Sequence, residues 1–230
     1  MKRLGQMKRS TRTSLFTYAL VIAAFVIVQL VRTFKEGGVG SVLEGQLIPI
    51  CAYIVMALSL NLVVGVSGEL SLGHAGFMSI GAFAGSAVAL GLQSSLGSAP
   101  LRLAVAMVAG AAVAALLGFL IGIPVLRLNG DYLAIVTLAF GEIIKSIVTN
   151  IYLGVDEDGL QFSFLSNTNQ LGEGGVELIR GPMGVMHSQR ISTFAAGFVL
   201  VLVALAVIFN LVNSRTGRAI MAARDNRIAA

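Results

Sequence analysis

Charged residues are scarce in this chain. They make up 12% of its 230 residues, whereas a soluble domain carries about 25%. The mean hydropathy is +0.88, and the apolar residues gather in long runs. This composition excludes a soluble globular domain, a disordered chain and a coiled coil, and predicts a membrane protein. The net charge of +5 does not indicate a nucleic-acid partner, because the basic residues cluster at the two chain ends.

The sequence has no tryptophan and one cysteine. Cys51 therefore has no partner for an intrachain disulfide, and its apolar surroundings predict a buried side chain. The motifs of catalysis are missing too: the sequence contains no HExxH, no cysteine pair, no P-loop and no nucleophile elbow. The two histidines, His74 and His187, are too far apart for a metal signature. The sequence therefore predicts no enzyme, no metal site and no cofactor in this chain.

Apolar runs predict an all-α polytopic membrane helix bundle of about six spans. The runs cover residues 15–31, 47–66, 72–92, 101–123, 131–148 and 191–212. A signal peptide is the alternative for the first run. Its hydrophobic region would have about 7–15 residues and a small-residue cleavage site after it. The first run is longer and no such site follows, so a retained helix is preferred.

Lys and Arg are distributed unevenly over the predicted loops. The tail at 1–14, the turn at 124–130 and the segment at 213–230 share one side and hold most of them. Fewer lie on the other side, where Arg102, at the start of the fourth span, is counted. By the positive-inside rule, both termini of the chain are cytoplasmic. The acidic loop at 150–190 then lies outside, and it is long enough to form a small structure.

A glycine-rich stretch at 65–85 interrupts the apolar pattern between spans two and three. Polar groups in hydrocarbon cost several kcal/mol each unless they are satisfied. We therefore expect a break here, either a re-entrant segment or a tight interfacial turn, that is buried in protein or lines a wet cavity. A broken helix offers positive N-termini and free carbonyls, which suits a zwitterion and equally other small polar solutes.

Polar residues within the membrane are expensive and tend to face a pathway. The pathway candidates are Asn61, Glu69, Ser71, Gly73, His74, Gly76, Thr137 and Glu142. Two alternatives stay open. Glu69 and His74 also suit an interfacial turn with capping hydrogen bonds. Glu142 also suits a structural ion pair with Lys145, three residues further along the same helix.

Small residues recur every four positions in the fourth predicted span and once in the third. They are Gly110, Ala114, Gly118 and Gly122, with Gly81 and Gly85. Such spacing lets helix backbones approach closely in lipid, and the stripe predicts a helix interface. The alternative is that alanine and glycine are simply common in membrane helices.

The segment at 213–230 alternates arginines with small apolar residues and predicts a short cytoplasmic helix. It suits either a basic helix on anionic lipid or a helix that docks in the groove of a soluble partner. No closing turn or polar tail follows it, so we expect the chain to be a fragment of a longer protein.

Three blocks resemble branched-chain amino acid ABC transporter permeases of the LivM type. They are LNLVVGVSGELSLGHAGFMSIGA at 60–82, NGDYLAIVTLAFGEIIK at 129–145 and SRTGRAIMAARDNRIAA at 214–230. The resemblance covers the chain from about residue 47 onward. It implies a bacterial inner-membrane protein that pairs with a LivH-type permease subunit. Two cytoplasmic ATPase subunits would bind the ATP, and an extracytoplasmic binding protein would deliver the amino acid.

By the same resemblance, the last block is the segment that couples the permease to the ATPase. The positions that match its pattern are Arg215, Gly217, Arg218, Ala222, Ala223, Arg224 and Asp225. The chain departs from the family in two ways. Arg227 stands where an acidic residue is expected, and the family continues with further membrane helices.

Four functions are compared. The first is an ATP-driven importer of leucine, isoleucine and valine, and the second is a related importer of urea or short amides. The third is a secondary transporter in which Glu69, His74 and Glu142 relay ions, but it has no need of the basic segment. The fourth is a membrane scaffold, which leaves the polar break unexplained.

Overall fold

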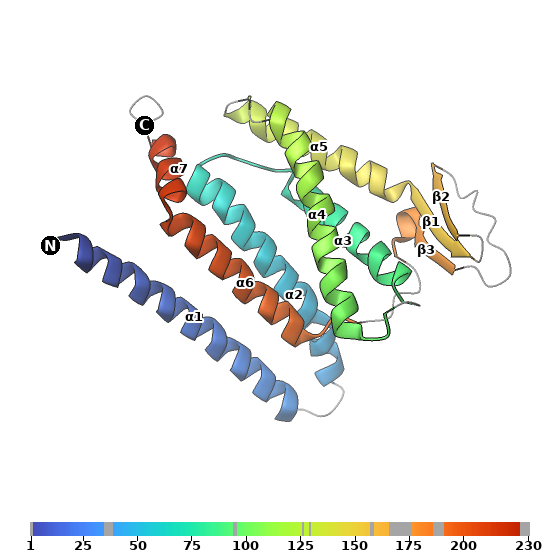
Figure 1. Cartoon of the computed structure of the whole chain (residues 1–230), viewed down its shortest axis with the longest axis horizontal. Coiled ribbons are helices and arrows are strands. Elements are labelled where there is room, and N and C mark those ends of the chain that lie inside the picture. Colours follow the sequence, from blue (N-terminus) through green and yellow to red (C-terminus); the bar gives the residue numbers. More distant parts are fainter. Residues whose placement is uncertain are drawn as a thin grey trace. The chain divides into compact units, whose positions relative to one another are not determined.

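A computed structural model describes residues 2–34, 39–93, 96–125, 127–128, 130–156, 159–165, 176–185 and 191–225 (Figure 1). Within them, six helices are long and apolar enough to cross a membrane. These are α1 (Lys2–Phe34), α2 (Val39–Asn61) with the π-helix η1 (Leu62–Ser67), α3 (His74–Gly91), α4 (Ala99–Val125), α5 (Asp131–Thr149) and α6 (Phe194–Asn213). The predicted all-α bundle of about six spans is confirmed.

The remaining elements lie at the ends of the spans. Helix α7 (Arg215–Asp225) follows α6, and α1 continues back through the basic N-terminal tail. The loop at 150–190 contains the strands β1 (Ile151–Asp156), β2 (Gly159–Phe164) and β3 (Val176–Arg180), followed by the 3-10 turn η2 (Gly181–Met183). The strands form an antiparallel sheet in the order β2-β1-β3. His187 lies outside the described residues.

The chain divides into two compact units, Met1–Ser67 with Ser192–Ala230, and Gly68–Ile191. In the first unit, α2 packs on α6 around the buried residues Cys51, Val201 and Leu205. Cys51 is free and 6% exposed, which confirms the buried position predicted for it. A Cβ on Gly197 would come within 3.0 Å of the Cys51 Cβ, so α2 and α6 approach closely at this glycine.

Aromatic contacts hold α1 against α6. The ring of Phe25 stacks on Phe198 with a centroid distance of 4.0 Å, and on Phe194 at 5.1 Å. Tyr18 meets Phe209 edge-on at 5.6 Å. The other face of α1 is open, with Leu15 and Phe16 each 68% exposed. An apolar helix that is open along one face suits contact with lipid.

In the second unit, α3 packs against both α4 and α5. A Cβ on Gly110 would come within 2.5 Å of the Gly81 carbonyl oxygen, and a Cβ on Gly85 within 3.0 Å of the Ala106 carbonyl. The same interface holds Ala114, whose Cβ lies 3.7 Å from a Cβ placed on Gly81. Gly118 faces the ring of Phe77, whereas a Cβ on Gly122 meets nothing within 4 Å. The close approach therefore uses part of the predicted stripe.

Arg102 lies near the start of the fourth span, within the predicted run at 101–123. Helix α4 begins at Ala99, with Pro100 in its first turn, where a missing N–H does least harm. Arg102 is therefore helical and only 8% exposed, and its Nε has no hydrogen-bond partner. Helix α4 thus begins two residues before the predicted run, within the Ser/Gly/Pro segment that the sequence assigns to a loop.

Candidate functional site

The helix type of span two changes just before the break between spans two and three. Span two leaves α-helical geometry at Leu62, runs through η1, and ends at Ser67. Gly68 then takes a positive φ of 77°, and regular helix resumes only at His74. A π-helix is rare and is frequently found at functional sites. The irregular backbone lies where the glycine-rich stretch predicts it.

Thr137 of α5 satisfies the backbone of this break. Its hydroxyl oxygen accepts a hydrogen bond from the Leu72 N–H at 3.1 Å and donates its own proton to the Ala134 carbonyl at 3.0 Å. The Gly76 N–H donates to the Gly73 carbonyl at 3.0 Å and closes the first turn of α3. Since an unsatisfied N–H is costly at membrane depth, the Thr137 hydroxyl helps to hold the break beside α5.

Glycines allow this close approach. A Cβ on Gly73 would collide with the backbone carbonyl of Thr137. One on Gly76 would come within 3.2 Å of both the Gly141 Cα and the Ile144 side chain, and one on Gly141 within 3.3 Å of the Gly73 Cα. Gly141 was not among the predicted site residues, and its signal in the sequence is a glycine in the middle of an apolar span.

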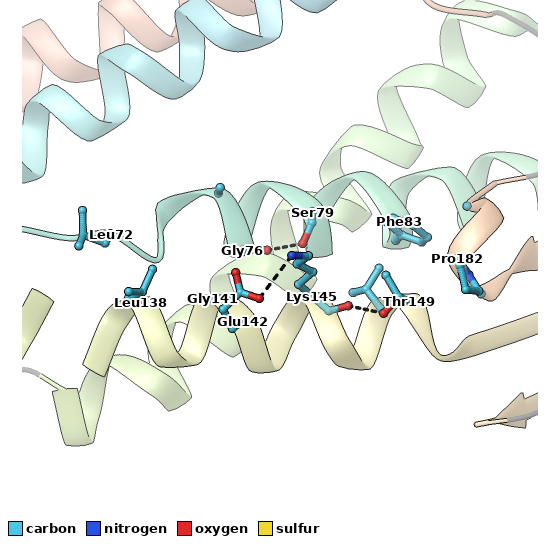
Figure 2. A pocket seen from close by; sticks show the side chains of 14 residues that line it. Leu72, Gly76, Ser79, Phe83, Leu138, Gly141, Glu142, Lys145, Thr149 and Pro182 are labelled. Atoms are coloured by element: carbon cyan, nitrogen blue, oxygen red, sulfur yellow. Dashed lines mark hydrogen bonds and ion pairs between the residues drawn. The ribbon is translucent and has the colours of Figure 1, made fainter. Parts of the chain in front are cut away.

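A groove of about 300 Å³ follows the line between α3 and α5 (Figure 2). It is lined by Leu72, Ala75, Gly76, Ser79, Phe83, Leu138, Gly141, Glu142, Lys145, Val148, Thr149, Gly181, Pro182 and Gly184. Most of this lining is apolar. The charges come from Glu142 and Lys145, whose Oε2 and Nζ lie 3.4 Å apart. Both side chains are about two-thirds exposed, at 66% and 68%.

The other pathway candidates lie apart from this groove. Glu69, Ser71 and His74 are partly buried in and beside the break, and they do not belong to the groove lining. Asn61 belongs to the first unit, where its side-chain oxygen occupies the space that a Cβ on Gly65 would need. The structure thus places Gly73 against Thr137 at the start of α3, and Gly76 and Glu142 in the groove lining, and leaves Asn61 in the other unit.

A sharp corner joins α6 to α7. The Ser214 hydroxyl donates to the Leu211 carbonyl at 2.6 Å and accepts from the Gly217 N–H at 3.1 Å, so one side chain caps both helices. Arg218 Nη1 donates to the Asn213 carbonyl at 2.9 Å. Gly217 is buried, and a Cβ there would collide with the backbone of Leu211 and Val212. Ser214 was not among the predicted site residues, although a serine just before a basic helix is typical of an N-cap.

Helix α7 contacts η1 within the first unit. Arg224 Nη1 donates to the Gly65 carbonyl at 2.6 Å, while its Nη2 lies 3.1 Å from an Asp225 carboxylate oxygen. Gly65 lies in the last turn before span two ends, where carbonyls have no intrahelical partner. A cation at this end of a helix is also favoured by the helix dipole. Arg224 therefore caps the C-terminal end of span two.

The rest of α7 is largely open. Arg215, Arg218, Ala222 and Ala223 are all exposed. Arg227 and the other residues after Asp225 lie outside the described part of the chain. Among the residues that the structure describes, no three His, Cys, Asp or Glu side chains gather closely enough to hold a metal ion.

Residues 42–230 match the protein family described as branched-chain amino acid transport system / permease component. The chain is 38% identical over 196 residues to the high-affinity branched-chain amino acid transport system permease protein LivM of Salmonella typhimurium. It is 37% identical to the protein of the same name from Escherichia coli K12. These alignments cover 77% of this chain and 42% of each relative, so the chain spans less than half the length of the relatives it matches. No solved structure matches the chain.

Proposed function

The chain belongs to the permease component family of branched-chain amino acid transport systems, and from this premise we propose that it is part of a membrane subunit of an ATP-driven importer. The substrates are leucine, isoleucine and valine. The subunit pairs with a LivH-type permease, and an extracytoplasmic binding protein supplies the amino acid. Two cytoplasmic ATPase subunits bind and hydrolyse the ATP, and both ends of this chain face them from the cytoplasm.

The contact between α7 and η1 carries this proposal. Through Arg224, α7 holds the Gly65 carbonyl three residues before the break begins at Gly68. Any displacement of α7 acts on this carbonyl and thereby on the backbone that leads into the break. The Ser214 corner keeps α7 at the end of α6. If an ATPase moves α7, the movement reaches the pathway through the hydrogen bond from Arg224 to the Gly65 carbonyl and through the backbone that runs from Gly65 into the break.

The open face of α7 supports the docking of a soluble partner. Arg215 and Arg218 supply charge there, and Ala222 and Ala223 supply small apolar surface. A short helix with this composition suits insertion into a groove on another protein. We assign Arg215, Arg218, Ala222, Ala223 and Asp225 to this ATPase contact, and we give Gly217 and Arg224 the internal roles described above.

The break and the groove form this chain's part of the transport pathway, and the partner permease forms the rest. Glycines at 73 and 76 leave room between α3 and α5, Thr137 holds the break in place, and Glu142 provides charge. Glu69, Ser71 and His74 line the break itself, and Asn61 shapes the end of span two. Irregular backbone at membrane depth is tolerated where it lines a cavity or is buried in protein.

The energy source of uptake, ATP or a proton gradient, distinguishes an importer from a secondary transporter. The full-length parent protein is co-expressed with its partner subunits in cells, and uptake of labelled leucine is followed. Depletion of ATP with the proton gradient maintained is expected to abolish uptake, whereas collapse of the gradient at normal ATP leaves it largely intact. The reverse pattern would refute the importer proposal and favour an ion relay through the intramembrane carboxylates.

Labelled urea and short amides, assayed in the same cells, separate the related importers. The proposal expects leucine, isoleucine and valine to compete with one another and urea to have no effect on them.

A further inference from the structure

The groove between α3 and α5 places one positive and one negative side chain beside apolar walls. We propose that Glu142 and Lys145 bind the ammonium and carboxylate ends of an α-amino acid, while the aliphatic side chain of that amino acid packs on the groove wall. This inference rests on the proposed import function for its class of solute, and it deepens that function by assigning a binding site.

Mutual neutralisation within one helix does not explain why this ion pair opens onto a groove. The two side chains are three residues apart on one helix, and this chain leaves about two-thirds of each exposed. Along the helix axis, Glu142 lies roughly 16 Å from Asp131 at 1.5 Å per residue, which is close to the middle of a hydrocarbon core about 30 Å thick. Charges at that depth tend to face a water-filled cavity or a partner.

The remaining polar groups of the groove fit a zwitterion. The Ser79 hydroxyl donates to the Gly76 carbonyl at 2.8 Å, and the Thr149 hydroxyl donates to the Lys145 carbonyl at 2.9 Å. Each hydroxyl oxygen also keeps lone pairs that can accept a hydrogen bond. A ligand carboxylate finds a side-chain donor in Lys145, and a ligand ammonium finds an acceptor in Glu142.

The walls and the size of the groove fit a small aliphatic side chain. Leu72, Phe83, Leu138 and Val148 line it with apolar surface. Its volume of about 300 Å³ is at the lower end of the range for ligand pockets, roughly 300–1,000 Å³. An amino acid therefore matches the groove better than a larger solute does.

The groove also reaches the end of α5. Gly181, Pro182 and Gly184, which follow β3, line it together with Thr149 (Figure 2). The charged pair lies between this end and the break at Leu72. With the sheet on the outer side, a solute released there meets the pair before it reaches the break.

The test compares neutral variants in the full-length complex reconstituted with its binding protein in proteoliposomes. We expect Glu142→Gln combined with Lys145→Gln to lower ATP-dependent leucine uptake by at least about tenfold, the effect of losing one charge-assisted hydrogen bond. Assembly and ATP hydrolysis should stay near the wild-type level. The matched control is Glu177→Gln with Arg180→Gln, which removes another pair three residues apart, outside the groove, and should leave uptake within about twofold.

A merely neutralising pair gives a different result. Each single variant would then lose uptake through an unpaired charge, whereas the double variant would transport like wild type. That result would overturn the inference while the importer function stands. If uptake by the wild-type complex did not depend on ATP, the proposed importer function would instead be overturned.

A second readout tests binding independently of ATP. In a cysteine-free background, Ser79→Cys is labelled with a small thiol reagent. Leucine is expected to protect this cysteine, whereas 3-methylbutylamine, which lacks the carboxylate, is not, and the double neutral variant abolishes the protection. Equal protection by both compounds, or no protection by leucine, would rule out the zwitterion site.

Discussion

Thr137 shows how a single side chain can support an irregular membrane backbone. Its hydroxyl accepts the Leu72 N–H across 65 positions of sequence and donates to its own helix. The break therefore needs no water at this N–H. An apolar side chain of the same size at position 137 could not replace the hydroxyl, because the Leu72 N–H would be left without an acceptor.

Thr137→Val is expected to destabilise the second unit by about 1–3 kcal/mol, because the Leu72 N–H is then left without an acceptor at membrane depth. Thermal unfolding of the detergent-solubilised complex measures the loss. Thr33→Val is the matched control, because the Thr33 hydroxyl donates to the Gln29 carbonyl of its own helix, and no contact to another element is seen for it among the described residues. Equal losses in the two variants would mean that the contact with Leu72 contributes nothing.

The sequence identified Thr137 as a polar residue within a span, but it could not identify the partner of its hydroxyl. Hydrophobic patterning locates a residue along one helix, and the pairing of helices decides which backbone group it meets. The same limit applies to Ser214, Gly141 and Arg224. Their partners lie on another element or across a corner, and no local spacing encodes such contacts.

At the scale of elements, α3 and α4 approach closely at Gly110, where an added Cβ would collide with the backbone of α3. Gly110 lies against the Gly81 carbonyl and the backbone of Gly85, whereas Gly122 in the same helix faces open space. The four-residue spacing in the sequence predicts the interface. It cannot show where the two helices diverge, because that depends on their crossing angle.

Gly110→Ala should destabilise the protein by about 1–3 kcal/mol, because the added methyl group forces the two backbones apart. Gly122→Ala makes the same chemical change in open space and should be neutral, or stabilising by up to about 1 kcal/mol through helix propensity. Unfolding midpoints of the two variants side by side provide the measurement. Similar destabilisation at both positions would refute a glycine-specific α3–α4 contact.

Arg224 joins two elements, and its loss should weaken their coupling. Arg224→Gln is expected to leave the complex assembled and hydrolysing ATP while the leucine transported per ATP falls several-fold, because the end of span two no longer follows α7. Arg224→Lys keeps a cation near the Gly65 carbonyl and should recover part of the yield. An unchanged ratio of transport to hydrolysis in Arg224→Gln would exclude this route.

At the scale of the whole molecule, the chain passes between the two compact units twice, between Ser67 and Gly68 at the start of the break, and between Ile191 and Ser192. Span two, α6 and α7 belong to the first unit, and the groove belongs to the second. The break is therefore one of two covalent links between the units, and it is the one that leads from span two to the groove. Composition and periodicity predict six spans and the position of the break, but the division into units arises from contacts between distant segments.

The most direct test of this account is ATP-dependent uptake of labelled leucine by the full-length complex in proteoliposomes, in wild type and in Gly217→Asp. The account predicts uptake that requires ATP in wild type. It predicts loss of that uptake in the variant with the complex still assembled, because any side chain at 217 displaces α7 from the end of α6. Uptake indifferent to both ATP and the substitution would contradict an importer driven through α7.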